Sequence, residues 1–284
     1  MIDRVRGIRW IEGGEAAARL AGITAQDIMP LIPGLEAEIA LIRLDGEKCV
    51  LKVWNRQSKP DIGFQYRLLR ALYDRGMPVS KPLAWGVDAS GHQALLTSYD
   101  GMPVREAEAD KPRRIAGMLL DIHRLRIDEP ELPRYDFVSY FFPGVEAHPD
   151  LATELDRLVG IARPRQDTFI HGDYNFDNIL ESEDGRLTII DWTNGQLGDA
   201  RYDIGWTILL ADVCTDDALA SAYRSAFLTG GGYAAEELEP FEAIALIRWL
   251  LLDRTAGMPR METTDERLRR IKERNRWISG LKRF

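Results

Sequence analysis

One segment past the middle of the chain, residues 170–192, combines a hairpin signal with a group of polar side chains that suggests chemistry. Its Asp-Gly pair at 184–185 lies between two β-favouring runs and predicts a two-residue turn. That turn would place Asn178 opposite Asp191, with the two Cβ atoms roughly 4.5–5.5 Å apart. An amide oxygen and a carboxylate at this separation can bind one hard cation such as Mg²⁺. Asp173 precedes Asn178 closely enough to bring a third oxygen group to the same place.

The spacing of these polar residues follows a wider pattern, His-x-Asp-x-x-x-x-Asn, then Ile-Asp-Trp, then two further aspartates. In this chain the pattern is His171-Gly172-Asp173, Asn178, Ile190-Asp191-Trp192, Gly198-Asp199 and Tyr202-Asp203-Ile204-Gly205. Asp and Asn are common in turns, but their joint spacing is specific. The sequence resembles the aminoglycoside phosphotransferase and choline kinase-like family, which comprises small-molecule kinases with a protein-kinase-like fold. The resemblance extends over residues 28–254.

This resemblance implies a role for each residue of the segment. Asp173 would be the catalytic residue that accepts the proton of the substrate hydroxyl. Asn178 and Asp191 would be the metal ligands that hold Mg²⁺ on the phosphates of ATP or GTP. Asp199 and Asp203 would tie the backbone of the catalytic loop together. The implied reaction is transfer of a nucleotide γ-phosphate to a hydroxyl of a small molecule, and aminoglycosides, macrolides, choline-like amines, amino-acid alcohols and sugars are all compatible with the sequence.

The first part of the chain is predicted to form strands that carry a nucleotide-binding lysine. Alternation in the run 48–54 places Lys52 on one face together with Val50 and Trp54. An Asp-Gly pair at 45–46 predicts a hairpin turn before this run. A lysine between apolar neighbours is costly to bury unless it meets anions. By the resemblance, Lys52 would contact the nucleotide phosphates, and the alternative is an edge-strand lysine that reaches solvent.

A helix predicted for residues 62–75 departs from the family pattern. The family helix usually offers a glutamate to pair with the strand lysine, and Gln65 stands at that position in this chain. An amide can orient Lys52 through one hydrogen bond but supplies no counter-charge, so Asp191 would carry more of that pairing. The alternative is that Gln65 only fills the edge of the core. The loop 33–37 has the position of a phosphate-covering loop but not its glycine pattern.

A short polar segment, residues 98–101, is expected to link two lobes. By the resemblance, backbone groups at Ser98 and Asp100 would hydrogen-bond the edge of an adenine or guanine base. The predicted fold is α+β and protein-kinase-like, with an N-terminal nucleotide-binding lobe over residues 1–98 and a C-terminal catalytic and substrate-binding lobe over residues 99–284. The first lobe would contain a small antiparallel sheet and one key helix. The second would be mainly helical and would carry the catalytic hairpin.

Composition narrows the class of function. The chain is 45% hydrophobic and 29% charged, as expected of an ordinary globular protein. Its two cysteines, Cys49 and Cys214, lie far apart and indicate buried thiols in a reducing cytoplasm. No apolar run approaches the roughly 18 residues of a spanning helix, and no membrane partner is expected. A net charge of −8 disfavours nucleic acid as a partner and permits a cationic substrate, and the basic tail 267–284 is expected to be a docked helix.

Three rival functions make different demands on the sequence. A two-metal hydrolase normally needs several histidine and carboxylate ligands, and the chain has only four histidines. A protein kinase has Asp-Phe-Gly where this chain has Ile-Asp-Trp at 190–192. A non-catalytic nucleotide-binding module is favoured only by Gln65 and would not need Asp173. His123 is expected to be a satisfied core histidine and not a base, and His171 is expected to brace the catalytic loop, because Asp173 already fills the role of the base.

Overall fold

The structure of the protein, a computed structural model, divides the chain into two compact units. The residues that it describes are 2–31, 37–58, 60–104, 110–128, 130–258 and 260–278. The first unit comprises residues 1–102 and 180–193, and the second comprises residues 103–179 and 194–284. Most of the candidate phosphate loop at 33–37 lies outside the described residues. The predicted division was a single boundary after residue 98. In the structure the first unit extends to residue 102 and also includes the hairpin residues 180–193.

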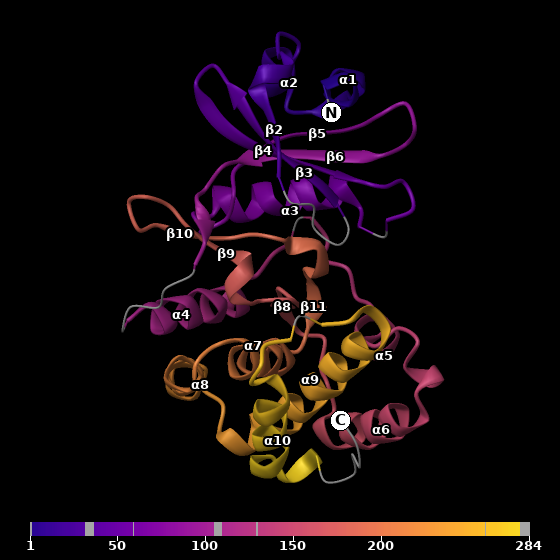
Figure 1. Ribbon diagram of the computed structural model, residues 1–284, viewed down its shortest axis with the longest axis vertical. Coiled ribbons are helices and arrows are strands. Elements are labelled where there is room, and N and C mark those ends of the chain that lie inside the picture. Colours follow the sequence, from indigo (N-terminus) through magenta and orange to yellow (C-terminus); the bar gives the residue numbers. More distant parts are fainter. Residues whose placement is uncertain are drawn as a thin grey trace. The chain divides into compact units, whose positions relative to one another are not determined.

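The first unit is built on a six-stranded antiparallel sheet with the spatial order β1-β5-β6-β4-β3-β2 (Figure 1). In chain order the strands are β1 (Arg9–Glu12), β2 (Ile28–Pro30), β3 (Ala37–Leu44), β4 (Glu47–Trp54), β5 (Pro82–Val87) and β6 (Gln93–Ser98). The helices of this unit are α1 (Ile2–Gly7), α2 (Gly14–Leu20), the 3₁₀ turn η1 (Ala25–Asp27) and α3 (Ile62–Asp74). The predicted small antiparallel sheet, the strand run at 48–54 and the hairpin turn before it are confirmed. Strand β1 is a short edge strand of alternating exposure that the sequence analysis did not predict.

Alternation along β4 gives the sheet two different faces. Cys49, Leu51 and Val53 of β4 lie in a hydrophobic core that α1 and α2 also enter. The even-numbered residues Val50, Lys52 and Trp54 line a pocket together with Gln65 and Leu69 of α3. Figure 1 shows α3 running along one face of this sheet. Period-two alternation therefore delivers Lys52 to the face that the sequence predicts.

The bounds of α3 follow from local chemistry. The Asp61 side chain accepts a hydrogen bond from the Phe64 N–H at 2.9 Å and caps the first turn. Gly76 takes a positive φ of 74° just past the last turn, where a glycine ends a helix at little cost. The helix predicted for residues 62–75 is thus confirmed to within one residue at its end.

Two Asp-Gly pairs form hairpin turns of different kinds. At 45–46 both residues have positive φ, 51° and 88°, and Leu44 pairs with Glu47 in the ladder. These values define the predicted two-residue turn of type I′. The pair at 184–185 behaves differently, since only Gly185 has a positive φ, 77°.

The second hairpin joins β9 (Ile179–Glu181) to β10 (Leu187–Ile189), which form a three-stranded sheet in the order β10-β9-β7 with β7 (Met102–Pro103). The Ser182 N–H donates to the Arg186 carbonyl at 3.0 Å, and the Gly185 N–H donates to the Ser182 carbonyl at 2.9 Å. This is a three-residue loop with glycine in the left-handed position. The predicted register is therefore wrong by one residue, because Ser182 lies opposite Arg186 and not opposite residue 187.

Neither predicted metal ligand lies in the strand ladder itself. Asn178 ends the 3₁₀ turn η3 (Phe176–Asn178), directly before β9. Asp191 follows the end of β10 and takes a positive φ of 63°. The expectation that these two residues face each other as cross-strand partners is thus wrong. Each is instead held by its own local turn.

The second unit is mainly helical (Figure 1). Its helices are α4 (Lys111–Arg124), α5 (Phe137–Phe141), η2 (Val145–Ala147), α6 (Pro149–Ala162), η4 (Trp192–Asn194) at its junction with the first unit, α7 (Ala200–Cys214), α8 (Asp217–Gly230), α9 (Ala235–Ala256), α10 (Thr264–Arg274) and η5 (Arg276–Ile278). Strand β8 (Thr168–Ile170) pairs antiparallel with β11 (Gln196–Gly198). The expectation of a mainly helical second lobe is confirmed, and in α6 Leu151, Leu155 and Leu158 repeat at helical spacing.

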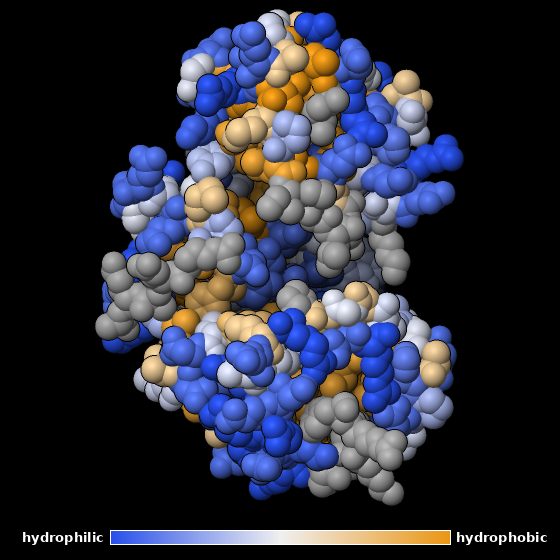
Figure 2. Space-filling model, in the orientation of Figure 1, coloured by the Kyte–Doolittle hydropathy of each residue, from blue (hydrophilic) through white to orange (hydrophobic). Residues whose placement is uncertain are grey.

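The basic tail packs as a helix on the second unit. Leu268 and Ile271 of α10 are buried, and Arg270 pairs with Asp217 of α8 at 2.7 Å. The docked-helix prediction is confirmed for the described part of the tail, and residues 279–284 lie outside it. Polar and charged residues cover most of the face that Figure 2 shows. In the described part of the chain, no helix is both long and apolar enough to cross a membrane.

Candidate active site

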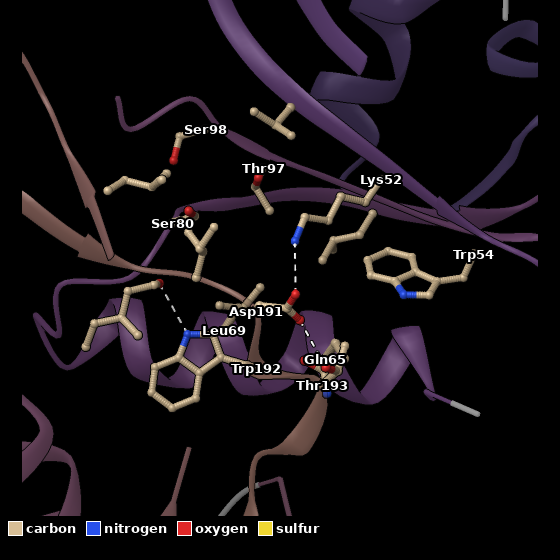
Figure 3. A pocket seen from close by; sticks show the side chains of 15 residues that line it. Lys52, Trp54, Gln65, Leu69, Ser80, Thr97, Ser98, Asp191, Trp192 and Thr193 are labelled. Carbon is tan, nitrogen blue, oxygen red and sulfur yellow. Dashed lines mark hydrogen bonds and ion pairs between the residues drawn. The ribbon is translucent and has the colours of Figure 1, made fainter. Parts of the chain in front are cut away.

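The first unit contains a largely apolar pocket with one lysine in it. Its lining comes from β4, α3, β6, and the hairpin strands with the turn after them. The lining residues are Val50, Lys52, Trp54, Gln65, Leu69, Ser80, Leu95, Thr97, Ser98, Leu180, Ile189, Ile190, Asp191, Trp192 and Thr193. Figure 3 shows the Lys52 side chain reaching into this pocket from the sheet. A ligand that enters would meet apolar walls and a few polar groups, which is the usual character of a small-molecule site.

Lys52 forms an ion pair with Asp191 in this pocket. Its Nζ lies 3.8 Å from Asp191 Oδ2, and the two side chains are 20% and 40% exposed (Figure 3). The Thr193 hydroxyl donates a hydrogen bond to Asp191 Oδ1 at 3.0 Å. Water still reaches both partners, so the pair itself contributes little to the free energy of unfolding. The left-handed backbone at Asp191 is uncommon for a residue with a side chain, and such strain is concentrated at functional sites.

Gln65 lies in the same pocket but does not bind Lys52. Its side chain is 5% exposed, and in the described part of the chain no hydrogen bond joins it to the lysine. Asp191 supplies the counter-charge that the family helix usually provides. The amide of Gln65 is therefore left facing the pocket. It can donate or accept one hydrogen bond from a bound molecule.

Ser98 and Asp100 lie at the link that follows β6. The Ser98 hydroxyl donates to Asp100 Oδ2 at 2.8 Å and accepts from the Lys81 N–H at 2.8 Å. The Ser98 N–H donates to the Lys81 carbonyl at 2.9 Å, so this N–H is already engaged. Ser98 lines the pocket, whereas Asp100 is buried and stabilises the link through Ser98.

The candidate catalytic loop, residues 171–178, belongs to the second unit, and its backbone is held by hydrogen bonds to one buried carboxylate, that of Asp203. Asp203 of α7 accepts hydrogen bonds from the N–H groups of His171 and Gly172 at 2.9 and 2.8 Å. His123 Nε2 lies 3.0 Å from the same carboxylate. Burial works to raise the pKa of Asp203, but the bonds to His123 and to the loop backbone hold that pKa below its usual range. These contacts confirm the structural role expected for Asp203. Of the two ring nitrogens of His123, Nε2 faces this carboxylate, whereas Nδ1 is buried without a hydrogen-bond partner among the described residues, so the expectation of a satisfied histidine holds for one nitrogen.

Asp199 has the second structural role. It caps α7 by accepting from the Arg201 N–H at 2.9 Å and forms an ion pair with the Arg201 guanidinium at 2.7 Å. It also accepts a hydrogen bond from the Arg165 N–H at 2.9 Å, which ties the start of α7 to the segment before β8. Asp203 therefore braces the loop 171–178, whereas the described contacts of Asp199 hold the start of α7 and the segment before β8, and not the loop that the resemblance implied.

Asp173 presents its carboxylate from this loop in a defined orientation. The Trp206 indole Nε1–H donates to Asp173 Oδ1 at 2.8 Å. The Asp173 carbonyl accepts from Asn178 Nδ2 at 2.9 Å, and that amide group also lies 3.5 Å from Asp173 Oδ2. Because the nitrogen of Asn178 is used in this way, its Oδ1 remains as an oxygen ligand. An amide oxygen and the Asp191 carboxylate are the donor types that Mg²⁺ prefers, so the residues present fit that ion.

Two residues of this loop's surroundings were missed in the sequence analysis, Trp206 of α7 and Arg248 of α9. Arg248 Nη1 donates to the Gly172 carbonyl at 2.9 Å, and the side chain is 8% exposed. A signal for Arg248 was present, because a single arginine interrupts the apolar run 243–252. A buried cation inside an apolar helix needs partners and therefore marks a site. Trp206 carries no comparable signal.

Comparison with known proteins places the chain in a family. A model of the family described as "Phosphotransferase enzyme family" matches residues 27–241. None of the curated proteins matches the sequence. Since the family model covers well over half of the chain, the protein belongs to the phosphotransferase enzyme family. It is accordingly a phosphotransferase of the small-molecule kinase type, with an alcohol group as acceptor, as the sequence analysis predicts.

Solved structures share the fold at low identity. A thermostable mutant of aminoglycoside phosphotransferase APH(4)-Ia in its apo form is 17% identical, with a TM-score of 0.68 over 96% of this chain and 100% of that chain. A choline/ethanolamine kinase family protein from Mesorhizobium loti is 18% identical, with a TM-score of 0.61 over 94% and 96%. An ethanolamine kinase from Plasmodium vivax is 13% identical, with a TM-score of 0.61 over 94% and 87%. The predicted protein-kinase-like fold is confirmed.

Proposed function

We propose that this protein transfers the γ-phosphate of ATP or GTP to a hydroxyl group of a small molecule, with Asp173 as the catalytic base. The observation that carries the proposal is the Lys52–Asp191 pair inside an apolar pocket. A cation and an anion held side by side in such a pocket suit a nucleotide phosphate and the metal ion on it. A neighbouring fold, APH(4)-Ia, has been solved in a ternary complex with AMP-PNP and hygromycin B, which supports a nucleotide co-substrate.

Each remaining site residue receives a proposed role. Lys52 binds a phosphate oxygen of the nucleotide, and the Gln65 amide offers a further hydrogen bond in the same pocket. Asn178 and Asp191 supply oxygen ligands to Mg²⁺, which when bound would offset negative charge on the phosphates. The purine would lie against the link at Ser98, with Asp100 holding that link in shape. The Lys52–Asp191 pair also argues against a non-catalytic nucleotide-binding module. That alternative was favoured by the missing helix glutamate, and Asp191 supplies the counter-charge in its place.

Asp173 acts on the acceptor and not on the nucleotide. Its Oδ1 accepts from the Trp206 N–H at 2.8 Å, whereas Oδ2 has a longer contact of 3.5 Å with Asn178 Nδ2, so Oδ2 is the oxygen that would receive the hydroxyl proton. The acceptor that we favour carries a hydroxyl near a cationic group, since the chain has a net charge of −8 and structural neighbours include an ethanolamine kinase. A cytoplasmic location stays a prediction, as does the absence of a nucleic-acid partner.

The test is a pair of matched variants, Asp173→Asn and Asp177→Asn. Asp177 lies on the same loop with its side chain exposed, so it controls for loss of a negative charge from this loop. We expect Asp173→Asn to abolish transfer to the acceptor and to leave the Kd for Mg-ATP within a few-fold, because the base contacts the hydroxyl. A thermal-shift panel of amine-bearing alcohols, sugars and antibiotics, each with Mg-ATP or Mg-GTP, would first identify an acceptor that binds the protein. Transfer to that acceptor would then be measured by a coupled ADP assay. Equal loss of nucleotide binding and turnover would refute the role of Asp173.

A further inference from the structure

Trp206 fixes one of the two oxygens of Asp173. Its indole Nε1–H donates to Asp173 Oδ1 at 2.8 Å, and the Trp206 side chain is buried, with 2% exposed. A buried ring cannot rotate without disturbing its neighbours, so the direction of its N–H is set by packing. A hydrogen bond from such a donor restricts rotation of the carboxylate. The other oxygen, Oδ2, is thereby held in one direction.

Arg248 lies against the same indole ring. The centre of its guanidinium is 4.1 Å from the centroid of the Trp206 ring and 5.0 Å from that of Phe141. Its Nη1 donates to the Gly172 carbonyl at 2.9 Å and to the Tyr202 hydroxyl at 3.1 Å. All these partners are neutral, and among the described residues no carboxylate oxygen lies within ion-pair distance of Arg248. A buried cation with neutral partners is costly, which argues for a function that retains it.

Close packing of two helices brings these groups together. Gly205 of α7 lies so near α9 that an added Cβ would be 2.8 Å from the Phe241 carbonyl carbon. This approach seats the next residue, Trp206, on the guanidinium of Arg248. A cation over the face of an indole ring withdraws electron density and strengthens the N–H as a donor. The chain of contacts therefore runs from Arg248 through Trp206 to the carboxylate of Asp173.

We propose that Trp206 and Arg248 are positioning residues for Asp173. Arg248 holds the carbonyl of the preceding residue, Gly172, and strengthens the indole donor, and Trp206 locks the carboxylate so that Oδ2 faces the acceptor hydroxyl. The catalytic consequence rests on the proposed function. The orientation of the carboxylate does not, and it can be measured without turnover.

The first experiment observes the indole N–H directly in ¹⁵N-tryptophan-labelled protein. The chain has seven tryptophans, and the Trp206 signal is assigned as the one lost in Trp206→Phe. We expect Asp173→Ala to shift this signal upfield more than any other indole signal, because a charge-assisted hydrogen bond is lost. Arg248→Lys is expected to shift it by a smaller amount, since lysine keeps the charge but not the planar stack. If Asp173→Ala leaves the Trp206 signal in place, the proposed contact is absent and the inference is overturned.

The second experiment compares Trp206→Phe with Trp249→Phe. Trp249 is also a fully buried tryptophan, but among the described residues its indole N–H has no hydrogen-bond partner, so the same substitution removes no contact to a base. We expect Trp206→Phe to lower kcat roughly 10- to 100-fold while KM for Mg-ATP stays within about twofold. Trp249→Phe should keep the kcat of the wild type. Equal effects of the two variants on kcat would overturn the positioning role.

These readouts separate failure of this inference from failure of the proposed function. A wild-type protein that binds Mg-ATP but transfers no phosphoryl group to any acceptor would refute the proposed function. The shift of the Trp206 signal in Asp173→Ala would still decide whether Trp206 orients the carboxylate. Loss of fold in an Arg248 variant would be recognised by loss of signal dispersion. In that case, the comparison of Trp206→Phe with Trp249→Phe would decide whether Trp206 positions Asp173.

Discussion

At the scale of single residues, the site depends on which carboxylate meets Lys52. The sequence leaves the lysine without its usual helix glutamate, and the structure pairs it with Asp191 at 3.8 Å. Gln65 lines the same pocket and is 5% exposed, but among the described residues it forms no hydrogen bond to Lys52. A lysine among apolar neighbours requires an anion within reach. Asp191, which ends the hairpin, meets that requirement.

Gln65→Glu would give Lys52 a second carboxylate in its pocket. We expect the free energy of unfolding to stay level or to rise by up to about 1 kcal/mol, and Mg-ATP to bind equally well or more tightly, because the ammonium is better positioned. Chemical denaturation and calorimetric titration would measure the two quantities. Gln65→Met keeps the length without charge and serves as the control. A loss of about 1–3 kcal/mol in Gln65→Glu without tighter nucleotide binding would show that the new carboxylate is buried away from Lys52.

At the scale of elements, the two hairpins show how neighbours decide the type of a turn. The same Asp-Gly dipeptide forms a type I′ turn at 45–46 and part of a three-residue loop at 183–185. In the second case the Ser182 hydroxyl accepts from the Arg186 N–H at 3.1 Å and also contacts Asp184. A serine side chain can replace backbone bonds in this way and so stabilise a wider loop. The one-residue error in the predicted register has this local cause.

Gly185→Ala tests the left-handed position of that loop. An added Cβ at Gly185 would meet nothing within 4 Å, so the cost is one of backbone conformation alone. With φ at 77°, we expect a loss of about 1–2 kcal/mol in the free energy of unfolding. Gly117→Ala is the matched control, because Gly117 lies inside α4 with equally open space and no positive φ, and it should gain about 0.5–1 kcal/mol. The same sign for both variants in urea denaturation would contradict the loop geometry.

At the scale of the whole molecule, buried and paired carboxylates connect the stability of the protein to pH. Arg254 of α9 forms a two-point contact with Asp150 of α6 and lowers the pKa of Asp150 to about 2. Asp203 is buried among donors that hold its pKa below the usual range. A carboxyl group whose pKa is lower in the folded state stabilises the fold above its unfolded pKa, and that contribution is lost as the pH falls through the folded value. Both groups therefore favour the folded state at neutral pH and cease to do so in acid.

We expect the melting temperature of the wild type to fall as the pH drops from about 4 toward 2. Asp203→Asn should cost about 3 kcal/mol or more at pH 7, because it removes a buried charge that accepts three hydrogen bonds. The difference in free energy of unfolding between Asp203→Asn and the wild type should become smaller as the pH falls below about 4. Asp150→Asn is the control, and it should cost no more than about 1 kcal/mol because its ion pair is solvent-exposed. Calorimetric scans across this pH range would measure both, and a gap that widens in acid would contradict the lowered pKa of Asp203.

Local patterns in the sequence were sufficient for the fold class and for much of the site. Alternation placed Lys52 on the correct face of β4, and an N-cap with a following Gly-x-Pro bounded α3 correctly. The spacing of the catalytic segment identified Asp173 and the bracing Asp203, whose contacts to the loop backbone the structure confirms. These features were readable because each depends on residues only a few positions apart, or on a spacing that a family pattern preserves.

The contacts that orient the Asp173 carboxylate were decided by tertiary structure alone. Trp206 lies 33 residues from Asp173 in the chain, and Arg248 lies 76 residues from Gly172. No periodicity encodes such a separation, because the partners meet only when α7 packs closely on α9 at Gly205. The register of the second hairpin was likewise settled by a serine side chain and not by its Asp-Gly pair. The sequence by itself therefore determined the fold class and the candidate residues of the site, and packing of distant helices determined how the Asp173 carboxylate is held, since direction in space arises from contacts between segments far apart in the chain.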